Sequence, residues 1–541
     1  MSAHANDPSQ EDFAKATRVA EYSPIPTANW RLKLVVFVAG AVLMGLEMAG
    51  SRVLATHFGS SIYVWGAIIS VFLAALAAGY YTGGIVADRR PTFLLLNVLL
   101  FIAGCWLLVM PLYANWVCRG VRSVNFGERL DPLIATVILF GGPSVLLGMV
   151  SPFAVRLAAR ELARIGNVSG RLYALSTVGS IVGTLLTAFW LVPLMGVRAL
   201  LQALGSSLIV LTIIAIPKSK KITAAAILVA GVLFAFSTFV GPLVEAKFRR
   251  GDRRVVFAAD SAYHHIQVID DARTNARFLN FNNYTESGIS LTSPYETLLF
   301  YTDAFQLGRI FRPELEQVLI IGGGGGVGAR KFVSDDPNVV VDLVEIDPMV
   351  VDVGQRFFYL QNDHRLRIHT EDGRNFVRKT TQKYDLIVLD AYTIGGQVPF
   401  HLTTQEFMRE LHSILKPGGV VLANINSALE GRRSRILRAE YKTIATVFPE
   451  LYLFPLGESR VSHTDPSFLN RRLNVILVAT TDERALNQDQ IAEIADRLVA
   501  VGRVRVTNFS EYALQLFTRP LKTDDVPLLT DDYAPVDTML F

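Results

Sequence analysis

Seven long apolar runs occupy the first half of the chain, and they constrain its fold more than any other feature. The runs are Leu32–Ala55, Ile62–Val86, Phe93–Val117, Leu133–Val155, Tyr173–Val197, Leu200–Pro217 and Ile222–Leu243. Runs of about 20 apolar residues are long enough to cross a bilayer as helices. They predict an all-α transmembrane bundle of about seven spans over residues 31–244. The tail before it, residues 1–30, is polar, so the first run is predicted to be a retained span rather than a signal peptide.

Composition excludes several classes of protein. The chain has 541 residues, of which 51% are hydrophobic and 18% charged, and its charged residues concentrate after Val244. This balance fits neither a wholly soluble protein nor a transporter bundle alone. The net charge of +4 comes with no basic stripe, so we expect no nucleic-acid partner. The two cysteines, Cys105 and Cys118, predict no disulfide framework and leave the redox compartment open.

The positive charges between the runs bear on orientation. Lysines and arginines gather in the N-terminal tail, in "DRRP", over Arg156–Arg171 and in "KSKK". If all seven runs span, these segments share one side, and the positive-inside rule places the N-terminus in the cytoplasm. Arg119, Arg122 and Arg129 lie on the other side. An odd number of spans then places everything after Leu243 outside the cytoplasm.

The second half has the pattern of a soluble protein. Residues 245–311 alternate apolar with polar side chains, as in "YHHIQVIDD" and "ARFLNFNN", which predicts a small subdomain of antiparallel strands. From residue 312 to residue 541, Val/Ile/Leu-rich strands alternate with helices. This alternation predicts an α/β Rossmann-like domain of the class I methyltransferase type, with a parallel sheet covered on both faces.

Polar features follow four successive strands of that sheet. Five glycines, Gly322–Gly326, follow the first strand, in "VLIIGGGGGVGARKF". Bare glycines let a ligand approach the backbone, and the helix behind them offers unpaired N–H groups. The remaining features are Glu345 and Asp347 after the second strand, Asp372 and Gly373 after the third, and Asp390 after the fourth. An acid after the second strand suits ribose hydroxyls, so we expect a nucleoside site at these strand ends.

These residues resemble a known family. The segments "VLIIGGGGGVGARKF", "VEIDPMVV", "EDGRNF", "YDLIVLDAY" and "LKPGGVVLANI" are similar to those of the spermidine synthase (polyamine aminopropyltransferase) family. The segments "FGSSIYVWG", "SPFAVRL" and "LTDDYAPVD" resemble its membrane-fused, multi-span branch, so the resemblance covers nearly the whole chain. It implies a transferase of polyamine biosynthesis that uses decarboxylated S-adenosylmethionine as co-substrate and has no tightly bound cofactor.

The resemblance also implies roles for residues. Donor binding would fall to Gly322, Gly323, Gly324, Gly326, Glu345, Asp347, Asp372 and Gly373, with Glu345 at the ribose and Asp372 and Gly373 at the adenine. Asp390 falls on the catalytic aspartate, which accepts the proton of the attacking amine. Tyr263, His264, Tyr295 and Tyr392 would surround the substrates.

Three positions depart from the family pattern. Gly325 stands where the family has the aspartate that recognises the aminopropyl nitrogen of the donor. Thr393 takes the place of a second acid after the catalytic one, and His264 replaces a glutamine. Two acids that would hold cationic amines are therefore missing.

Three functions stay open at this stage. The first is transfer of an aminopropyl group to an amine acceptor such as putrescine. The second is a methyltransferase-type reaction of S-adenosylmethionine itself, and the third is a non-catalytic transporter or sensor of polyamines or nucleosides. Adjacent His264 and His265 point to opposite faces of a strand pattern, so no metal site is expected.

Partners and location follow from these functions. We expect a nucleoside donor, an amine acceptor, the lipid bilayer and a second copy in a homodimer as partners. The chain is expected to be a multi-pass protein of the cell membrane. Both donor nucleosides are cytoplasmic metabolites, which favours a cytoplasmic α/β domain, whereas seven spans with the N-terminus inside favour an external one. The sequence leaves the side open.

Overall fold

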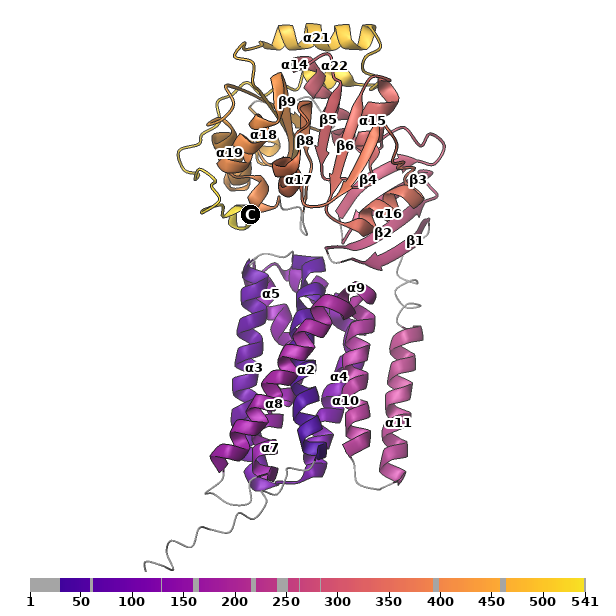
Figure 1. The fold of residues 1–541 in the computed structure, drawn as a ribbon, viewed down its shortest axis with the longest axis vertical. Coiled ribbons are helices and arrows are strands. Elements are labelled where there is room, and N and C mark those ends of the chain that lie inside the picture. Colours follow the sequence, from indigo (N-terminus) through magenta and orange to yellow (C-terminus); the bar gives the residue numbers. More distant parts are fainter. Residues whose placement is uncertain are drawn as a thin grey trace, which may run out of the picture.

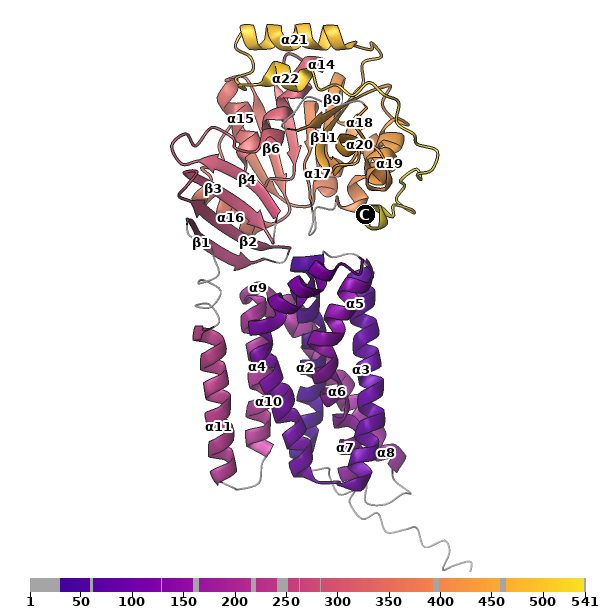
Figure 2. The same ribbon diagram turned by 180° about the vertical axis from the view of Figure 1, so that it is seen from behind.

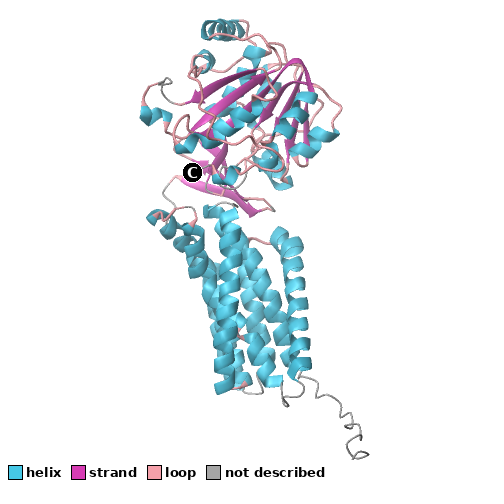
Figure 3. Cartoon of the chain, turned by 90° about the vertical axis from the view of Figure 1, so that its left-hand side faces the viewer, coloured by secondary structure: helices cyan, strands magenta, loops and turns pink. Residues whose placement is uncertain are grey.

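The computed structural model contains a helical bundle and an α/β domain stacked end to end (Figure 1). It describes residues 30–58, 62–127, 129–158, 165–215, 220–240, 252–261, 263–282, 284–392, 398–457 and 464–539. The predicted N-terminal tail before Trp30 and the departure at Thr393 lie outside the described residues. A small antiparallel sheet lies at the junction of the two parts, as the side view in Figure 3 also shows.

The bundle is built from long apolar helices with three π-helical turns. Its elements are α2 (Trp30–Phe58), α3 (Ile62–Arg89), α4 (Phe93–Val124), α5 (Leu130–Thr136), η1 (Val137–Gly141), α6 (Gly142–Gly148), α7 (Val150–Ala158), α8 (Ile165–Leu186), η3 (Thr187–Leu191), α9 (Val192–Leu194), α10 (Val197–Ala215), α11 (Lys220–Ala235) and η4 (Phe236–Val240). Within the described ranges, six helical stretches are long and apolar enough to cross a membrane. The seventh predicted run forms α11 and η4, whose apolar stretch, Ile227–Thr238, is shorter than those six.

Small residues bring α2 and α8 into close contact. A Cβ atom on Gly179 would lie 2.1 Å from the carbonyl oxygen of Phe37, and one on Gly183 would lie 2.1 Å from that of Ala41. Only glycine fits where two helix backbones approach this closely, as is common in lipid. Small residues of the segments "GAVLMG" in α2 and "STVGSIVGTLL" in α8 therefore lie against each other.

Charged residues mark the two ends of the bundle. Arg156 pairs with Asp88 at 3.2 Å at the end remote from the α/β domain. At the opposite end, beside that domain, the Arg122 guanidinium donates to the backbone carbonyl of His57 at 3.2 Å. The segment "DRRP" and the Arg156 segment thus lie at one end of the bundle and Arg122 lies at the other, as the sequence predicted.

The small sheet follows the bundle. Its antiparallel strands, in the order β1-β2-β3-β4, are β1 (Arg253–Asp260), β2 (His265–Asp271), β3 (Ala276–Phe281) and β4 (Tyr284–Ser290). Its buried face includes Ile266, Val268 and Leu279, which pack with Val350 and Val353 of α16 (Pro348–Phe357). This packing joins the small sheet to the α/β domain (Figure 2).

The α/β domain has a seven-stranded sheet in the order β10-β11-β9-β8-β5-β6-β7. Its strands are β5 (Gln317–Ile321), β6 (Val340–Glu345), β7 (Leu366–Thr370), β8 (Tyr384–Leu389), β9 (Leu415–Ser427), β10 (Glu450–Leu456) and β11 (Leu473–Thr480). The five strands from β5 to β9 are parallel, as predicted. The last two, β10 and β11, were not predicted. Because β11 pairs antiparallel with both β9 and β10, the whole sheet is mixed.

Helices cover both faces of this sheet over two separate apolar cores. They are α13 (Phe300–Asp303), η5 (Ala304–Leu307), α14 (Gly308–Phe311), α15 (Val327–Asp335), α16, α17 (Gly373–Lys379), η6 (Phe400–Leu402), α18 (Gln405–Ser413), η7 (Arg432–Ser434), α19 (Arg435–Ile444), α20 (Pro466–Leu469), α21 (Gln488–Ala500), α22 (Phe509–Ala513) and η8 (Val536–Thr538). The chain leaves β5 for β6 on one side and later returns to its other side with β8. This reversal opens a crevice at the carboxyl ends of β5 and β8, where such sheets bind ligands.

Candidate active site

The glycine run lies in that crevice, between β5 and α15. Gly322 has a φ of +103°, and a Cβ atom there would lie 2.2 Å from the carbonyl oxygen of Asp390. Gly326 caps α15 with a φ of +71°. Both positions combine a left-handed backbone with no room for a side chain, so glycine is required. The run is therefore a fixed turn rather than a flexible linker.

Glu345 holds this turn against the end of β6. Its carboxylate accepts the N–H of Gly323 at 2.8 Å and the N–H of Asp347 at 2.9 Å. Burial raises the pKa of Glu345, while these two backbone donors oppose the rise. The side chain lines a cavity beside the glycines, at the edge where ribose hydroxyls are expected.

The other acids after β6 and β7 begin helices. Asp347 accepts the N–H of Met349 at 2.9 Å and a hydrogen bond from Ser261, and it is not among the lining residues of the cavity. Asp372 accepts the N–H of Asn375 at 2.9 Å and also pairs with the His401 ring at 3.0 Å. Asp372 and Gly373 do line the cavity. Asp347 and Asp372 both cap the N-terminus of a helix, but only Asp372 lines the cavity, where it can touch a ligand.

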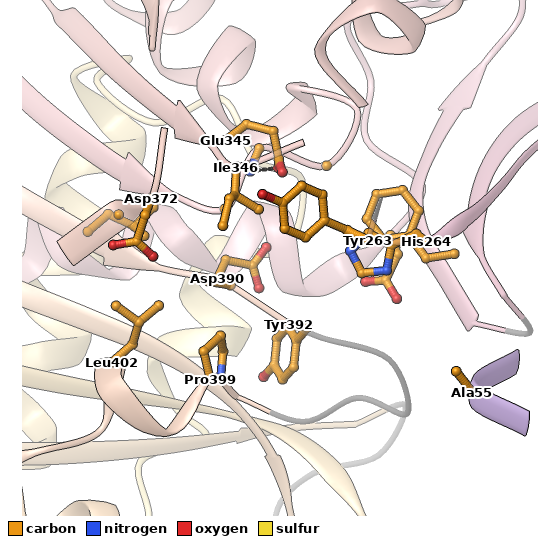
Figure 4. A pocket seen from close by; sticks show the side chains of 18 of the residues that line it. Ala55, Tyr263, His264, Glu345, Ile346, Asp372, Asp390, Tyr392, Pro399 and Leu402 are labelled. Carbon is orange, nitrogen blue, oxygen red and sulfur yellow. Dashed lines mark hydrogen bonds between the residues drawn. The ribbon is translucent and has the colours of Figure 1, made fainter. Parts of the chain in front are cut away.

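Asp390 lies at the centre of the cavity, just after β8 (Figure 4). The Asn424 side-chain amide donates to its carboxylate at 2.8 Å. Burial, together with the neighbouring carboxyl of Glu286, raises the pKa of Asp390 to about 8. The hydrogen bond from Asn424 lowers this pKa and so offsets part of the rise. Near neutral pH this group readily takes or gives a proton, which suits a general base.

Glu286 is a lining residue that the sequence analysis missed. It stands on β4 and faces the same cavity as Asp390, and burial, with Glu345 nearby, raises its pKa to about 7. The hydroxyl of Tyr301 donates to its backbone carbonyl at 2.5 Å and lines the cavity too. No motif marks either residue; the available signal was an acid within the subdomain predicted to consist of strands.

Gly325, which stands where the family has an aspartate, contacts Ser287, the residue that follows Glu286 on β4. Its N–H donates to the hydroxyl of Ser287 at 2.9 Å, and a Cβ atom would come within 3.1 Å of Ser287 and Phe358. A Cβ atom at Gly325 would face Ser287 and Phe358, whereas the Glu286 carboxyl lines the cavity from β4.

The predicted aromatic residues separate into two groups. Tyr263, His264 and Tyr392 line the cavity, whereas Tyr295 does not. Tyr295 is 63% exposed, and the Arg330 guanidinium covers its ring at 5.1 Å. The His264 ring stacks on Phe281 at 4.5 Å, and its pKa is lowered to about 4 by burial and by Arg52. A neutral His264 does not repel a cationic substrate.

The cavity has a volume of about 450 Å³ and lies between the α/β domain, the small sheet and the bundle. Figure 4 shows Asp372 and Leu402 on one side of Asp390, and Tyr263, His264 and Ala55 on the other. Residues of the bundle that line it are Met48, Ser51, Arg52, Ala55, Val64, Trp65, Ala188 and Val192. Over the described part of the chain, no group of His, Cys, Asp and Glu has the arrangement of a metal site.

Comparison with known proteins shows which family the α/β domain resembles. Residues 302–455 match the family described as the Spermine/spermidine synthase domain. A polyamine aminopropyltransferase from Vibrio vulnificus is 32% identical over 236 residues, which cover 43% of this chain and 72% of the relative. The chain belongs to the polyamine aminopropyltransferase family. As a member of this aminopropyltransferase family, it is an enzyme of the aminopropyltransferase type.

A longer aminopropyltransferase also matches. Polyamine aminopropyltransferase 2 from Aquifex aeolicus is 22% identical over 440 residues, which cover 79% of this chain and 84% of the relative. That alignment is longer than the part of the chain after residue 244, so it includes part of the helical half. Among solved structures, a probable spermidine synthase from Corynebacterium glutamicum aligns with a TM-score of 0.39 and 23% identity, covering 51% of this chain and 100% of that one.

Proposed function

We propose that this protein is a bilayer-anchored aminopropyltransferase that takes decarboxylated S-adenosylmethionine as donor and a primary amine as acceptor. One observation carries the proposal: Asp390, with its raised pKa, lies at the centre of a cavity that Glu345 and Asp372, at the ends of neighbouring strands, also line. The six apolar helices of membrane-spanning length support the anchoring. Putrescine, the family's ordinary acceptor, is a first candidate for the amine.

In this proposal the donor lies along the carboxyl ends of β5, β6 and β7. Its adenine borders Asp372 and Gly373, and its ribose hydroxyls hydrogen-bond to Glu345 beside the glycine turn. The primary ammonium of the aminopropyl group pairs with Glu286, which takes the part of the aspartate missing at Gly325. A charge-assisted contact of this kind also keeps Glu286 ionised.

The reaction is a displacement at carbon. The acceptor nitrogen attacks the aminopropyl carbon bonded to the sulfonium, so a C–N bond forms while the C–S bond breaks. The electron pair of that bond stays on sulfur, and methylthioadenosine leaves as a neutral thioether. The proton released from the acceptor nitrogen passes to Asp390, whose negative charge also stabilises the nitrogen as it becomes cationic.

Asp390→Asn tests this assignment. The substitution keeps size and hydrogen bonding but removes the base, so methylthioadenosine release is expected to fall by about 10²–10⁴-fold. Binding of methylthioadenosine, measured by calorimetry on the same sample, should be nearly unchanged because the glycine turn and Glu345 are intact. Wild-type turnover in Asp390→Asn would refute the role of Asp390 as base.

A further inference from the structure

The helical bundle supplies one wall of the catalytic cavity. Residues from three of its segments line the same cavity as Asp390: the last turns of α2, the first turn of α3, and the η3–α9 segment. The apolar members of this wall are Met48, Ala55, Val64, Trp65, Ala188 and Val192. The bundle is therefore part of the substrate site and not only an anchor for it.

This wall differs in chemistry from the opposite one. Glu286, Glu345, Asp372 and Asp390 all belong to the small sheet or the α/β domain. Among the described lining residues, the bundle contributes no acid, and its two polar side chains are Ser51 and the cationic Arg52. A second ammonium of a diamine placed against this wall would lose water without gaining a counter-charge, which is costly. An apolar group placed there is stabilised instead.

The wall also lies near the surface of the proposed bilayer. Ala55 is close to the end of α2 at Phe58, and Trp65 is close to the start of α3 at Ile62. Both helices have 28 or 29 residues, so their ends reach beyond a hydrocarbon core about 30 Å thick. Tryptophan favours this interfacial depth. Amine-bearing headgroups of lipids occupy the same depth.

We infer that the acceptor is an amphiphilic primary amine drawn from the membrane surface, with its amine at Asp390 and its apolar body along the bundle wall. The inference rests on the proposed aminopropyl transfer and assigns the acceptor class for that same site. An amine-headed phospholipid fits this chemistry, because Arg52 favours a phosphate and disfavours a second ammonium. The bond changes are those already given, with a secondary amine on the amphiphile as product.

Acceptor competition in nanodiscs tests the inference. Full-length protein is supplied with decarboxylated S-adenosylmethionine, and methylthioadenosine and the acceptor mass are measured by mass spectrometry. The acceptors are phosphatidylethanolamine in the disc, octylamine and putrescine; phosphatidylcholine discs, which hold no primary amine, are the control. We expect kcat/KM for octylamine, or turnover of the phospholipid, to exceed that for putrescine by about tenfold or more.

The outcomes separate the inference from the proposed function. Aminopropylation of phosphatidylethanolamine identifies a lipid as the source, and modification of octylamine alone identifies a free amphiphile. Preference for putrescine, with both amphiphiles inert, overturns the inference and leaves aminopropyl transfer standing. Absence of methylthioadenosine with every acceptor overturns both.

A change in the wall should change the preference. Ala55→Asp places a carboxylate among the apolar side chains, and it is expected to raise kcat/KM for putrescine relative to octylamine by about tenfold. Ala55→Asn has nearly the same shape without the charge and should leave the ratio unchanged. Equal ratios in the two variants, both still binding methylthioadenosine, would overturn the inference.

Trp65→Ala is a second probe that adds no charge to the bundle. Loss of its ring removes apolar contact, so kcat/KM should fall by a larger factor for octylamine than for putrescine. An equal fall for both acceptors would count against an apolar acceptor body on this wall.

Discussion

Asp390 lies among groups that make its negative charge costly. Burial and the nearby Glu286 carboxyl raise its pKa to about 8, and the amide of Asn424 is the one side-chain donor recorded for it among the described residues. Because the base acts in its ionised form, its pKa determines the pH at which the free enzyme becomes competent. A bound sulfonium donor brings positive charge and lowers that pKa.

The pH profile should therefore have a distinctive form. We expect kcat/KM, which reports on the free enzyme, to rise with pH through about 8. The corresponding rise of kcat should occur at lower pH, because the bound donor lowers the pKa of Asp390. Asn424→Ala removes the donor that opposes the rise, so its kcat/KM limb should move to higher pH. Initial rates of methylthioadenosine release across pH measure both. An unmoved limb in Asn424→Ala would contradict this account of Asp390.

Glu286 is expected to recognise the donor through its aminopropyl ammonium. Glu286→Gln should raise the Kd of decarboxylated S-adenosylmethionine by about 10–100-fold, since a hydrogen bond to a charged group contributes about 1.5–3 kcal/mol. Methylthioadenosine has no aminopropyl group, so its Kd should be unchanged and serves as the control. Calorimetry on both ligands measures the difference. Equal weakening for the two would place Glu286 elsewhere in the mechanism.

At the scale of elements, the turn from β5 to α15 forms one side of the proposed donor site. Gly322→Ala would put a methyl group 2.2 Å from the Asp390 carbonyl at a φ of +103°, so the turn must move. We expect this variant to lose measurable binding of methylthioadenosine. Gly325→Ala is the matched control, because its new methyl would meet side chains at 3.1 Å and needs a smaller adjustment. Equal binding in the two variants would contradict this reading of the turn.

The sequence predicted the parallel part of the sheet because its strands are continuous apolar runs that end in glycine or an acid. It placed Asp372 and Asp390 at strand ends, and the fold brings them into one cavity. Glu286 escaped prediction because a single acid in an alternating strand does not show which neighbour it faces. Tyr295 was expected near the substrates by motif, but it does not line the cavity, and its exposed ring contacts Arg330.

The antiparallel pair β10 and β11 shows a second limit of local patterns. Their residues are almost wholly buried, and a buried run has no period that distinguishes strand direction. Direction depends on pairing between distant segments, here Leu473–Thr480 with β9. The same holds for the bundle wall: no sequence pattern pointed to Ala55 or Trp65 as lining residues, because the cavity they line exists only after the two halves pack together.

At the scale of the whole molecule, the helix count determines which side the α/β domain occupies. Trp30 begins α2 at the end of the bundle remote from that domain, and α11 with η4 runs back toward it (Figure 1). We expect the N-terminus and the α/β domain on opposite sides of the membrane. Reporters of cytoplasmic and external location, fused in turn before Met1 and after Phe541, should give opposite signals. Matching signals would mean that one of these helices does not cross.

The nucleoside released during turnover tests aminopropyl transfer most directly. Full-length protein in nanodiscs is incubated with an amine and with either decarboxylated S-adenosylmethionine or S-adenosylmethionine. The released nucleosides are then separated and identified by mass spectrometry. We predict methylthioadenosine from the first donor and no S-adenosylhomocysteine from the second. Release of S-adenosylhomocysteine, with no methylthioadenosine from the decarboxylated donor, would contradict aminopropyl transfer in this cavity.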